Sequence, residues 1–125
     1  MIGYVTLGTN KFNEAAAFYD ALLAIVGAKR GMEMENHFIA WGSAPNAPML
    51  SIIKPYDGKA ASVGNGVMVA LHCPSKDLVK KVHAKALELG GKDEGAPGPR
   101  GDGGFYAGYF RDLDGNKLNA FCMGG

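Results

Sequence analysis

Three polar side chains, Tyr4, His72 and Asn119, stand inside runs of otherwise apolar, strand-forming residues. A phenol, an imidazole and an amide could together polarise a small molecule and move a proton, so we take them as candidate catalytic residues. Side chains alternate between the two faces of a strand, which indicates that each of the three faces a cavity. The alternatives are that Tyr4 and Asn119 bond to each other or to trapped water in an inert cavity, and that His72 is a rim histidine bonded to backbone or water.

Other residues could contact a ligand without reacting with it. Aromatic side chains in the expected strands could stack on a flat or apolar molecule, although strand aromatics usually belong to the core. Arg100 stands in the glycine-rich segment 95–104, where a mobile loop could bring it to a ligand carboxylate. That segment lacks the Gly-Lys-Ser/Thr ending of a phosphate loop. The candidate ligand-binding residues are Thr6, Trp41, Ser51, Met68, Arg100, Tyr106, Tyr109 and Phe121.

The charge balance and the hydropathy exclude several kinds of partner. Thirteen Lys and Arg residues against 12 Asp and Glu give a net charge of +1, which offers no electrostatic case for binding nucleic acid or an anionic membrane. No apolar run approaches the roughly 20 residues of a membrane helix, and the N-terminus lacks signal-peptide features. We therefore expect a cytoplasmic location and a small-molecule ligand. Cys73 and Cys122 fit a reducing compartment as free, apolar-facing thiols, and their spacing matches no zinc motif.

The elements that position these residues occur in nearly the same order twice. In the first half, the sequence predicts a strand at 2–9, a helix capped by Asn10 and ended by Gly27, and three strands. In the second half, it predicts a strand, a helix, a short extended piece at 92–95 and two strands joined by the Asp-Gly turn of "DLDGN". The remaining expected elements are strands at 31–35, 37–42, 48–54, 66–73, 105–111 and 116–123, and a helix at 75–89.

This repetition predicts an α+β domain over residues 1–125, built from two βαβββ modules at about 1–58 and 64–125. The modules should form a curved mixed sheet around a central cup, with the helices on the outer faces. Alternation then assigns the cup-facing positions, which are Tyr4, Thr6, Gly8, Met49, Ser51, Ile53, Met68, Ala70, His72, Lys117, Asn119 and Phe121.

Three motifs in this order, "GYVTLGT…FYDALL", "ALELGGKDEGAPG" and "YFRDLDGNKLNAF", resemble the vicinal oxygen chelate superfamily, which includes glyoxalase I, bleomycin-resistance proteins and extradiol dioxygenases. The resemblance covers nearly the whole chain and implies the cupped fold and a homodimer. Metal-dependent members hold a divalent ion on four strand residues, commonly His, Glu or Gln, His and Glu. The corresponding positions here are Tyr4, Ser51, Met68 and Asn119, which are poor ligands for such an ion. We therefore expect no metal and no other cofactor.

Three functions are compatible with the sequence. The first is a glyoxalase-like enzyme, related to lactoylglutathione lyase, acting on a small molecule without a metal. The second is a binding module that sequesters an aromatic or hydrophobic compound, as the bleomycin-resistance branch does. The third is a regulatory or purely structural protein with an empty cup. Whether the chain is an enzyme is undecided by its sequence.

Overall fold

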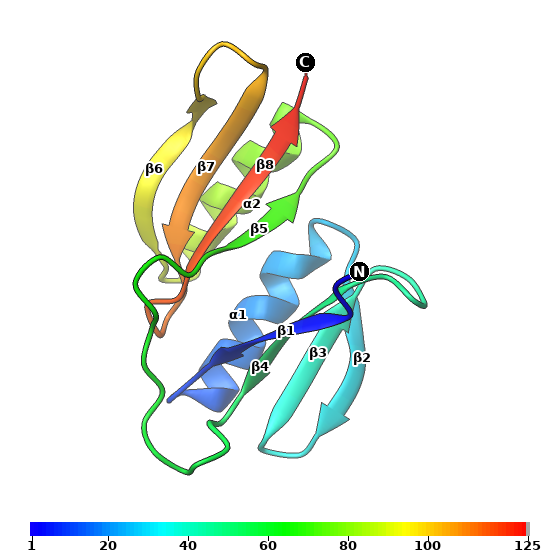
Figure 1. The fold of residues 1–125 in the computed structure, drawn as a ribbon, viewed down its shortest axis with the longest axis vertical. Coiled ribbons are helices and arrows are strands. Elements are labelled where there is room, and N and C mark those ends of the chain that lie inside the picture. The colour runs from blue at the N-terminus through cyan, green and yellow to red at the C-terminus, as the bar shows by residue number, and fades with distance from the viewer. Residues whose placement is uncertain (125) are drawn as a thin grey trace.

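Each half of the chain forms a four-stranded mixed sheet backed by one helix (Figure 1). Residues 1–124, which this computed structural model describes, contain two helices and eight strands. The first sheet has the strand order β1-β4-β3-β2 and the second the order β5-β8-β7-β6. In the first half the elements are β1 (Tyr4–Gly8), α1 (Phe12–Ala24), β2 (Lys29–Met34), β3 (Phe38–Gly42) and β4 (Met49–Ile53). In the second half they are β5 (Val69–His72), α2 (Lys76–Glu88), β6 (Lys92–Pro99), β7 (Phe105–Arg111) and β8 (Lys117–Met123). The predicted α+β class and the repeated βαβββ order are confirmed.

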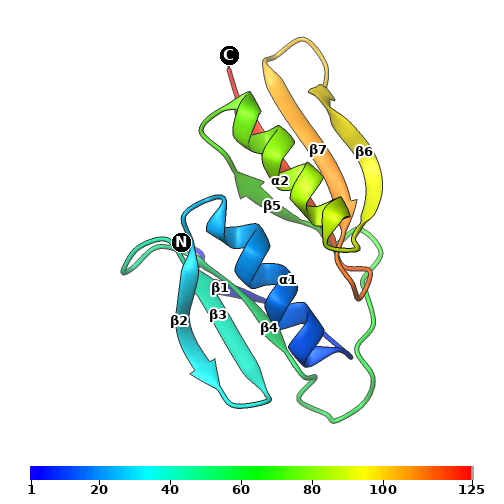
Figure 2. The same cartoon turned by 180° about the vertical axis from the view of Figure 1, so that it is seen from behind.

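Both helices cover the same side of the two sheets (Figure 2). The helix-facing side chains of the strands join the apolar stripes of α1 and α2 in a single core. The helix-free side faces the viewer in Figure 1, and we call it the open face. Neither helix in the described part of the chain is long and apolar enough to span a membrane.

The two sheets meet at edge strands. β1 is the outer strand of the first sheet and β5 the outer strand of the second, and within residues 1–124 no other strand pairs with the free side of either. Figures 1 and 2 both show these two strands facing each other across the middle of the molecule. We call this junction the seam.

A buried hydrogen-bond network fastens the two modules together. Asp112, in the turn between β7 and β8, accepts a hydrogen bond from the hydroxyl of Tyr19 in α1 at 2.6 Å. Asn116 donates its amide to Asp112 at 3.0 Å and to the backbone carbonyl of Gly8 at 3.0 Å. The "DLDGN" segment is therefore both the expected hairpin turn and a link between the modules. Gly115 within it has φ +89°, a backbone conformation that favours glycine.

Two local expectations were wrong. Asn10 does not cap α1, because its side chain bonds instead to the backbone of Ala61 in the segment between the modules, at 2.7 and 3.1 Å. The extended piece expected at 92–95 continues to Pro99, and Arg100 therefore follows a strand. β6 is an edge strand with bulges, and such a strand tolerates the glycines and prolines that indicated a loop.

Candidate functional site

The strand register places the predicted cup positions on the open face. In the first sheet Tyr4 lies opposite Met49, and Thr6 lies opposite Ser51. In the second sheet Asn119 lies between Ala70 and Tyr109 on the neighbouring strands. Since direct cross-strand partners share a face, each sheet contributes one continuous set of side chains to this surface.

These residues differ sharply in exposure. Tyr4 is 63% exposed, and Thr6 is also exposed, whereas Ser51 is fully buried and Asn119 is 1% exposed. The Oγ of Ser51 and the Oδ1 of Asn119 have no hydrogen-bond partner among the described residues. Buried polar atoms are normally paired, so the two occupy unusual positions. They are also equivalent, because each lies in the last strand of its module.

The seam contains a cavity of about 520 Å³, which we call the seam cavity. Met68, Ala70 and His72 line it from the second module, and Met49 lines it from the first. The end of α1 and the turn that follows it also contribute, through Leu23 and Val26. Apart from His72 and Ser43 the lining side chains are apolar or aromatic. The sequence did not identify Leu23 and Val26 as site residues, because nothing in their spacing shows that this end of the helix reaches the seam.

The four positions that correspond to metal ligands do not surround this cavity as a set. Met68 lines the seam cavity, whereas Tyr4 lines a separate hollow of about 360 Å³ over the first sheet, with Met32, Met34 and Phe38. Ser51 and Asn119 line neither. The donor set itself is a phenol, a hydroxyl, a thioether and an amide, which is a poor match for zinc, nickel or iron. Within residues 1–124 no three His, Cys, Asp or Glu side chains are grouped closely enough to hold a metal ion. The residues present therefore do not fit the divalent metal of the metal-dependent relatives.

His72 and Phe121 form an aromatic pair beside the seam. Their rings lie 5.5 Å apart in an edge-to-face arrangement, and Phe105 stacks on Phe121 at 5.7 Å. His72 is exposed and Phe121 half-buried, so both are accessible from the open face. Their participation in binding stays a prediction.

Two of the predicted ligand contacts, Trp41 and Tyr106, are buried in the core, and their part in binding stays a prediction. Trp41 is 1% exposed, packs near Tyr19 and donates its indole N–H to Asp20 at 2.9 Å. Tyr106 is also buried, opposite Cys122 on the helix-facing side of the second sheet. Trp41 borders the seam cavity from the core, but neither ring belongs to the open face. Neither β3 nor β7 alternates between apolar and polar residues along most of its length, so the sequence could not show which face of these strands is covered.

Arg100 and Tyr109 form a contact at the margin of the open face. The guanidinium carbon of Arg100 lies 5.5 Å from the centre of the Tyr109 ring, as does the ammonium of Lys117. Arg100 also donates hydrogen bonds to the carbonyls of Ala96 and Gly98, at 2.8 and 2.9 Å. These bonds fix the Arg100 side chain against the preceding strand, β6. A role in binding a ligand carboxylate remains a prediction for Arg100.

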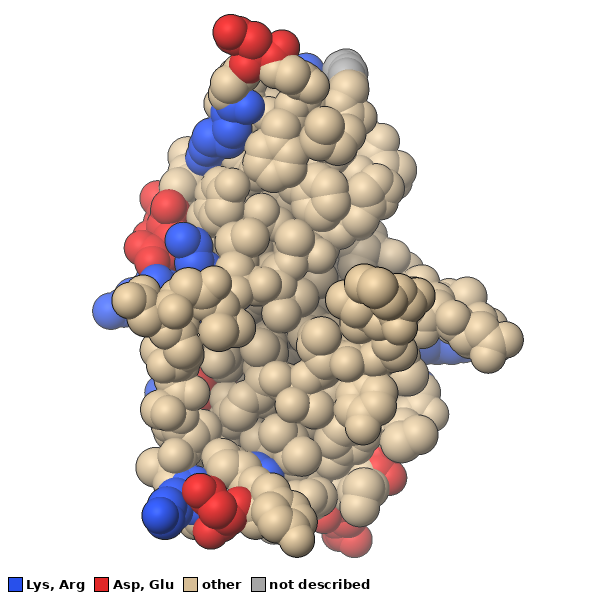
Figure 3. Space-filling view, in the orientation of Figure 1, with Lys and Arg blue, Asp and Glu red and all other residues tan. Residues whose placement is uncertain are grey.

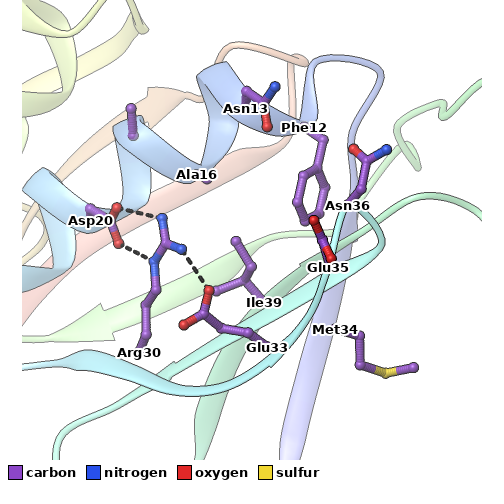
Figure 4. A pocket seen from close by; sticks show the side chains of 11 residues that line it. Phe12, Asn13, Ala16, Asp20, Arg30, Glu33, Met34, Glu35, Asn36 and Ile39 are labelled. Atoms are coloured by element: carbon purple, nitrogen blue, oxygen red, sulfur yellow. Dashed lines mark hydrogen bonds and ion pairs between the residues drawn. The ribbon is translucent and has the colours of Figure 1, made fainter.

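A further groove, of about 490 Å³, lies between α1 and β2 on the helix side (Figure 4). There the guanidinium of Arg30 bridges the carboxylates of Asp20 and Glu33, at 2.7 and 2.8 Å. The hydrogen bonds from Arg30 lower the pKa of Asp20 below its ordinary value. Arg30, Asp20 and Glu33 are thus paired with one another, whereas Glu35, which also lines the groove, forms no ion pair with a described residue.

Both cysteines are free and buried. Burial, reinforced by the neighbouring Cys122, raises the pKa of Cys73 to about 11, so its thiol stays protonated near neutral pH. A protonated, buried thiol is a poor nucleophile, and neither cysteine belongs to the candidate site.

Comparison with known proteins agrees with this architecture. The model of the Glyoxalase/Bleomycin resistance protein/Dioxygenase superfamily matches residues 1–120. A glyoxalase/bleomycin resistance protein from Albidiferax ferrireducens is 31% identical with a TM-score of 0.89, covering 98% of each chain. A lactoylglutathione lyase from Agrobacterium tumefaciens is 18% identical with a TM-score of 0.69, covering 98% of this chain and 92% of its own. Among curated proteins, none matches the sequence.

The family match spans nearly the whole chain, and the structure with 31% identity superposes over almost its full length. The second βαβββ module carries the motif "YFRDLDGNKLNAF" across the end of β7, the turn and β8, as the resemblance implies. The chain belongs to the Glyoxalase/Bleomycin resistance protein/Dioxygenase superfamily.

Proposed function

We propose that this protein is a binding module that holds an apolar, aromatic small molecule in the seam cavity. The observation that carries the proposal is the cavity itself, about 520 Å³ in volume and lined almost entirely by apolar and aromatic side chains. Cavities of a few hundred Å³ with such linings are typical of small-molecule sites. The methionines Met49 and Met68 add flexible, polarisable contacts that can adapt to a ring.

The polar groups at the cavity suit recognition better than metal chemistry. His72 offers a hydrogen bond at the edge of an otherwise apolar lining, which could orient a ligand. The positions that would hold a divalent ion carry donors that do not fit one. Binding needs no such ion, and an apolar cavity supplies its own driving force through burial of the ligand.

A substitution that fills the cavity tests the proposal. Ala70 lines the seam cavity and is itself exposed, so Ala70→Trp should occupy the space without creating a void in the core. Ala84→Trp, at an exposed position of α2 outside the cavity, is the matched control. With the neutral bicyclic amide 2-naphthamide as the probe, isothermal titration calorimetry should show saturable binding to the wild type and to Ala84→Trp. Binding to Ala70→Trp should be at least about tenfold weaker. Equal affinity in all three proteins, or no binding to the wild type, would refute the proposal.

A second candidate is a metal-independent, glyoxalase-like lyase. It is favoured by the accessibility of Tyr4 and His72, which lie on β1 and β5, the two strands that face each other across the seam. In such a reaction the phenol and the imidazole would have to polarise the substrate and move its proton. An assay with methylglyoxal and glutathione, with and without added metal, tests it directly. Activity that falls in both Tyr4→Phe and His72→Gln would support this candidate, and a flat assay would remove it.

A further inference from the structure

A second cavity, of about 480 Å³, adjoins the seam cavity, and we call it the linker cavity. One wall is the segment 63–68 between the two modules, and the opposite wall is formed by Arg111 and Lys117. Met68 lines both cavities, which makes them neighbours. A ligand held in the seam cavity could therefore extend a substituent into the linker cavity.

The two charged side chains of the linker cavity are direct neighbours of the same sign. Arg111 on β7 lies directly opposite Lys117 on β8. On its other side Arg111 lies directly opposite Lys92 on β6. Like charges in direct cross-strand positions destabilise a sheet. Three cations thus lie side by side across three strands, and their mutual repulsion lowers the stability of the sheet.

Only part of this charge is compensated within the protein. Arg111 donates from Nε to the carboxylate of Glu94 at 2.7 Å and from Nη1 to the carbonyl of Gly115 at 3.1 Å. Its Nη2 makes no hydrogen bond to any described residue. Lys117 forms no ion pair within the described chain, and its ammonium lies 5.5 Å from the centre of the Tyr109 ring. The Lys117 ammonium is the least compensated charge at the cavity.

The opposite wall offers space and no negative charge. Its residues Val63 to Met68 carry no ionisable side chain, and no carboxylate lines the cavity. Gly66 has φ +95°, so a larger residue would be strained there. At Gly64 a Cβ would lie 2.7 Å from Cγ2 of Val67. Substitution is therefore restricted at both glycines, and the cations share the cavity with a wall that carries no compensating charge.

We propose, on the basis of the function proposed for the seam cavity, that the linker cavity binds the carboxylate of an amphipathic ligand whose aromatic body lies in the seam cavity. The ammonium of Lys117 and the free edge of the Arg111 guanidinium supply the charge-assisted hydrogen bonds. The bound anion relieves the repulsion between the two cations. The ligand class is therefore an aromatic carboxylate, and Lys117 is the specificity-determining residue that distinguishes it from a neutral aromatic compound.

Calorimetric titration with 2-naphthoate and with its neutral counterpart 2-naphthamide tests this assignment. The wild type should bind 2-naphthoate at least about tenfold more tightly, which corresponds to about 1.4 kcal/mol. In Lys117→Gln the preference for 2-naphthoate should fall, because only the Arg111 guanidinium remains to pair with the carboxylate. Lys117→Arg should keep most of the preference. Lys92→Gln, which removes a cation of the same row outside the cavity, is the matched control and should keep it as well.

The stability of the unliganded protein gives an independent readout. Because Lys117→Gln removes a repulsive charge, its melting temperature without ligand should equal or exceed that of the wild type. A lower melting temperature would show that Lys117 has a stabilising role in the fold and would overturn the assignment.

The remaining outcomes separate the two proposals. If the wild type binds both compounds equally and Lys117→Gln changes neither affinity, the carboxylate site is refuted while the apolar binding module stands. If inorganic phosphate binds as tightly as 2-naphthoate and competes with it, the cavity is a general anion site, and the two-cavity ligand is refuted. If neither naphthalene compound binds, both proposals fail.

Discussion

At the scale of single residues, Asn119 and Ser51 are the least expected feature of the molecule. Strand alternation correctly predicted that both lie on the helix-free face, but it could not predict their burial, which depends on the side chains around them. Tyr4, on the same face, is largely exposed. Each of the two equivalent residues has a buried polar atom without a partner among the described residues. This lack of a partner distinguishes the two positions more clearly than their residue types alone do.

Replacing Asn119 should raise stability. Asn119→Leu removes a buried amide oxygen that has no partner among the described residues, and such an atom costs about 1–3 kcal/mol. We therefore expect a higher free energy of unfolding in urea, by about 1 kcal/mol. Asn116→Leu is the control, since Asn116 is also buried but bonds to Asp112 and Gly8, and its loss should destabilise the protein. Equal destabilisation by both substitutions would show that Asn119 is satisfied in solution.

Cys73 should make the protein sensitive to alkaline pH. The folded pKa of its thiol is about 11, above the ordinary value of 9.0, so the unfolded chain releases this proton first. The folded protein therefore keeps its full stability below about pH 9. Its free energy of unfolding falls as the pH rises toward 11, because the thiol then ionises in the unfolded chain but not in the folded one. In urea titrations across this range, the free energy of unfolding of the wild type should fall more steeply than that of Cys73→Ala. Parallel pH profiles would contradict the burial of an un-ionised thiol.

At the scale of elements, the spacing of apolar residues was sufficient to predict where several strands and helices begin and end. The strand expected at 105–111 has the observed bounds, and the helix expected at 75–89 differs by one residue at each end. Ser75 caps that helix, accepting a hydrogen bond from the N–H of Leu78 at 3.2 Å. Asn10 failed as a cap because a distant partner, Ala61, competes for its side chain. Such a contact depends on the tertiary fold and has no local signal.

The hydrogen bond between α1 and the "DLDGN" turn should contribute measurably to stability. Tyr19→Phe deletes a buried bond of 2.6 Å to the carboxylate of Asp112, and bonds to charged groups contribute about 1.5–3 kcal/mol. We expect a loss of that size in the free energy of unfolding. Tyr56→Phe alters a fully exposed ring and should change stability by less than about 0.5 kcal/mol. If the two variants are indistinguishable, the network does not hold the modules together.

At the scale of the whole molecule, the sequence predicted two modules because their elements repeat in order. It could not predict the seam cavity, which depends on the distance between β1 and β5 and on the end of α1. It also placed the four ligand positions around one cup, whereas Tyr4 and Met68 line different cavities. The angle between modules is set by side chains from both halves, and no local pattern encodes it.

The open face also bears on assembly. It is largely uncharged, with charged side chains mainly at its margins (Figure 3). Tyr4, Met32 and Met34 are each more than half exposed around the hollow over the first sheet. Extended apolar patches of this kind mark interaction sites, so we expect a homodimer that covers this hollow. Sedimentation equilibrium should then give a dimer for the wild type and a monomer for Met32→Glu. Leu87→Glu, on α2, should remain dimeric, and a monomeric wild type would contradict the expectation.

The most direct test of the central claim is to locate a bound aromatic molecule by NMR. Amide chemical shifts would be recorded for the ¹⁵N-labelled protein with and without saturating 2-naphthamide. We expect the largest changes at the two sides of the seam, in residues 68–72 and at the end of α1 around Leu23 and Val26. Changes confined to the groove between α1 and β2, or no changes at saturating ligand, would contradict the assignment of the seam cavity as the binding site.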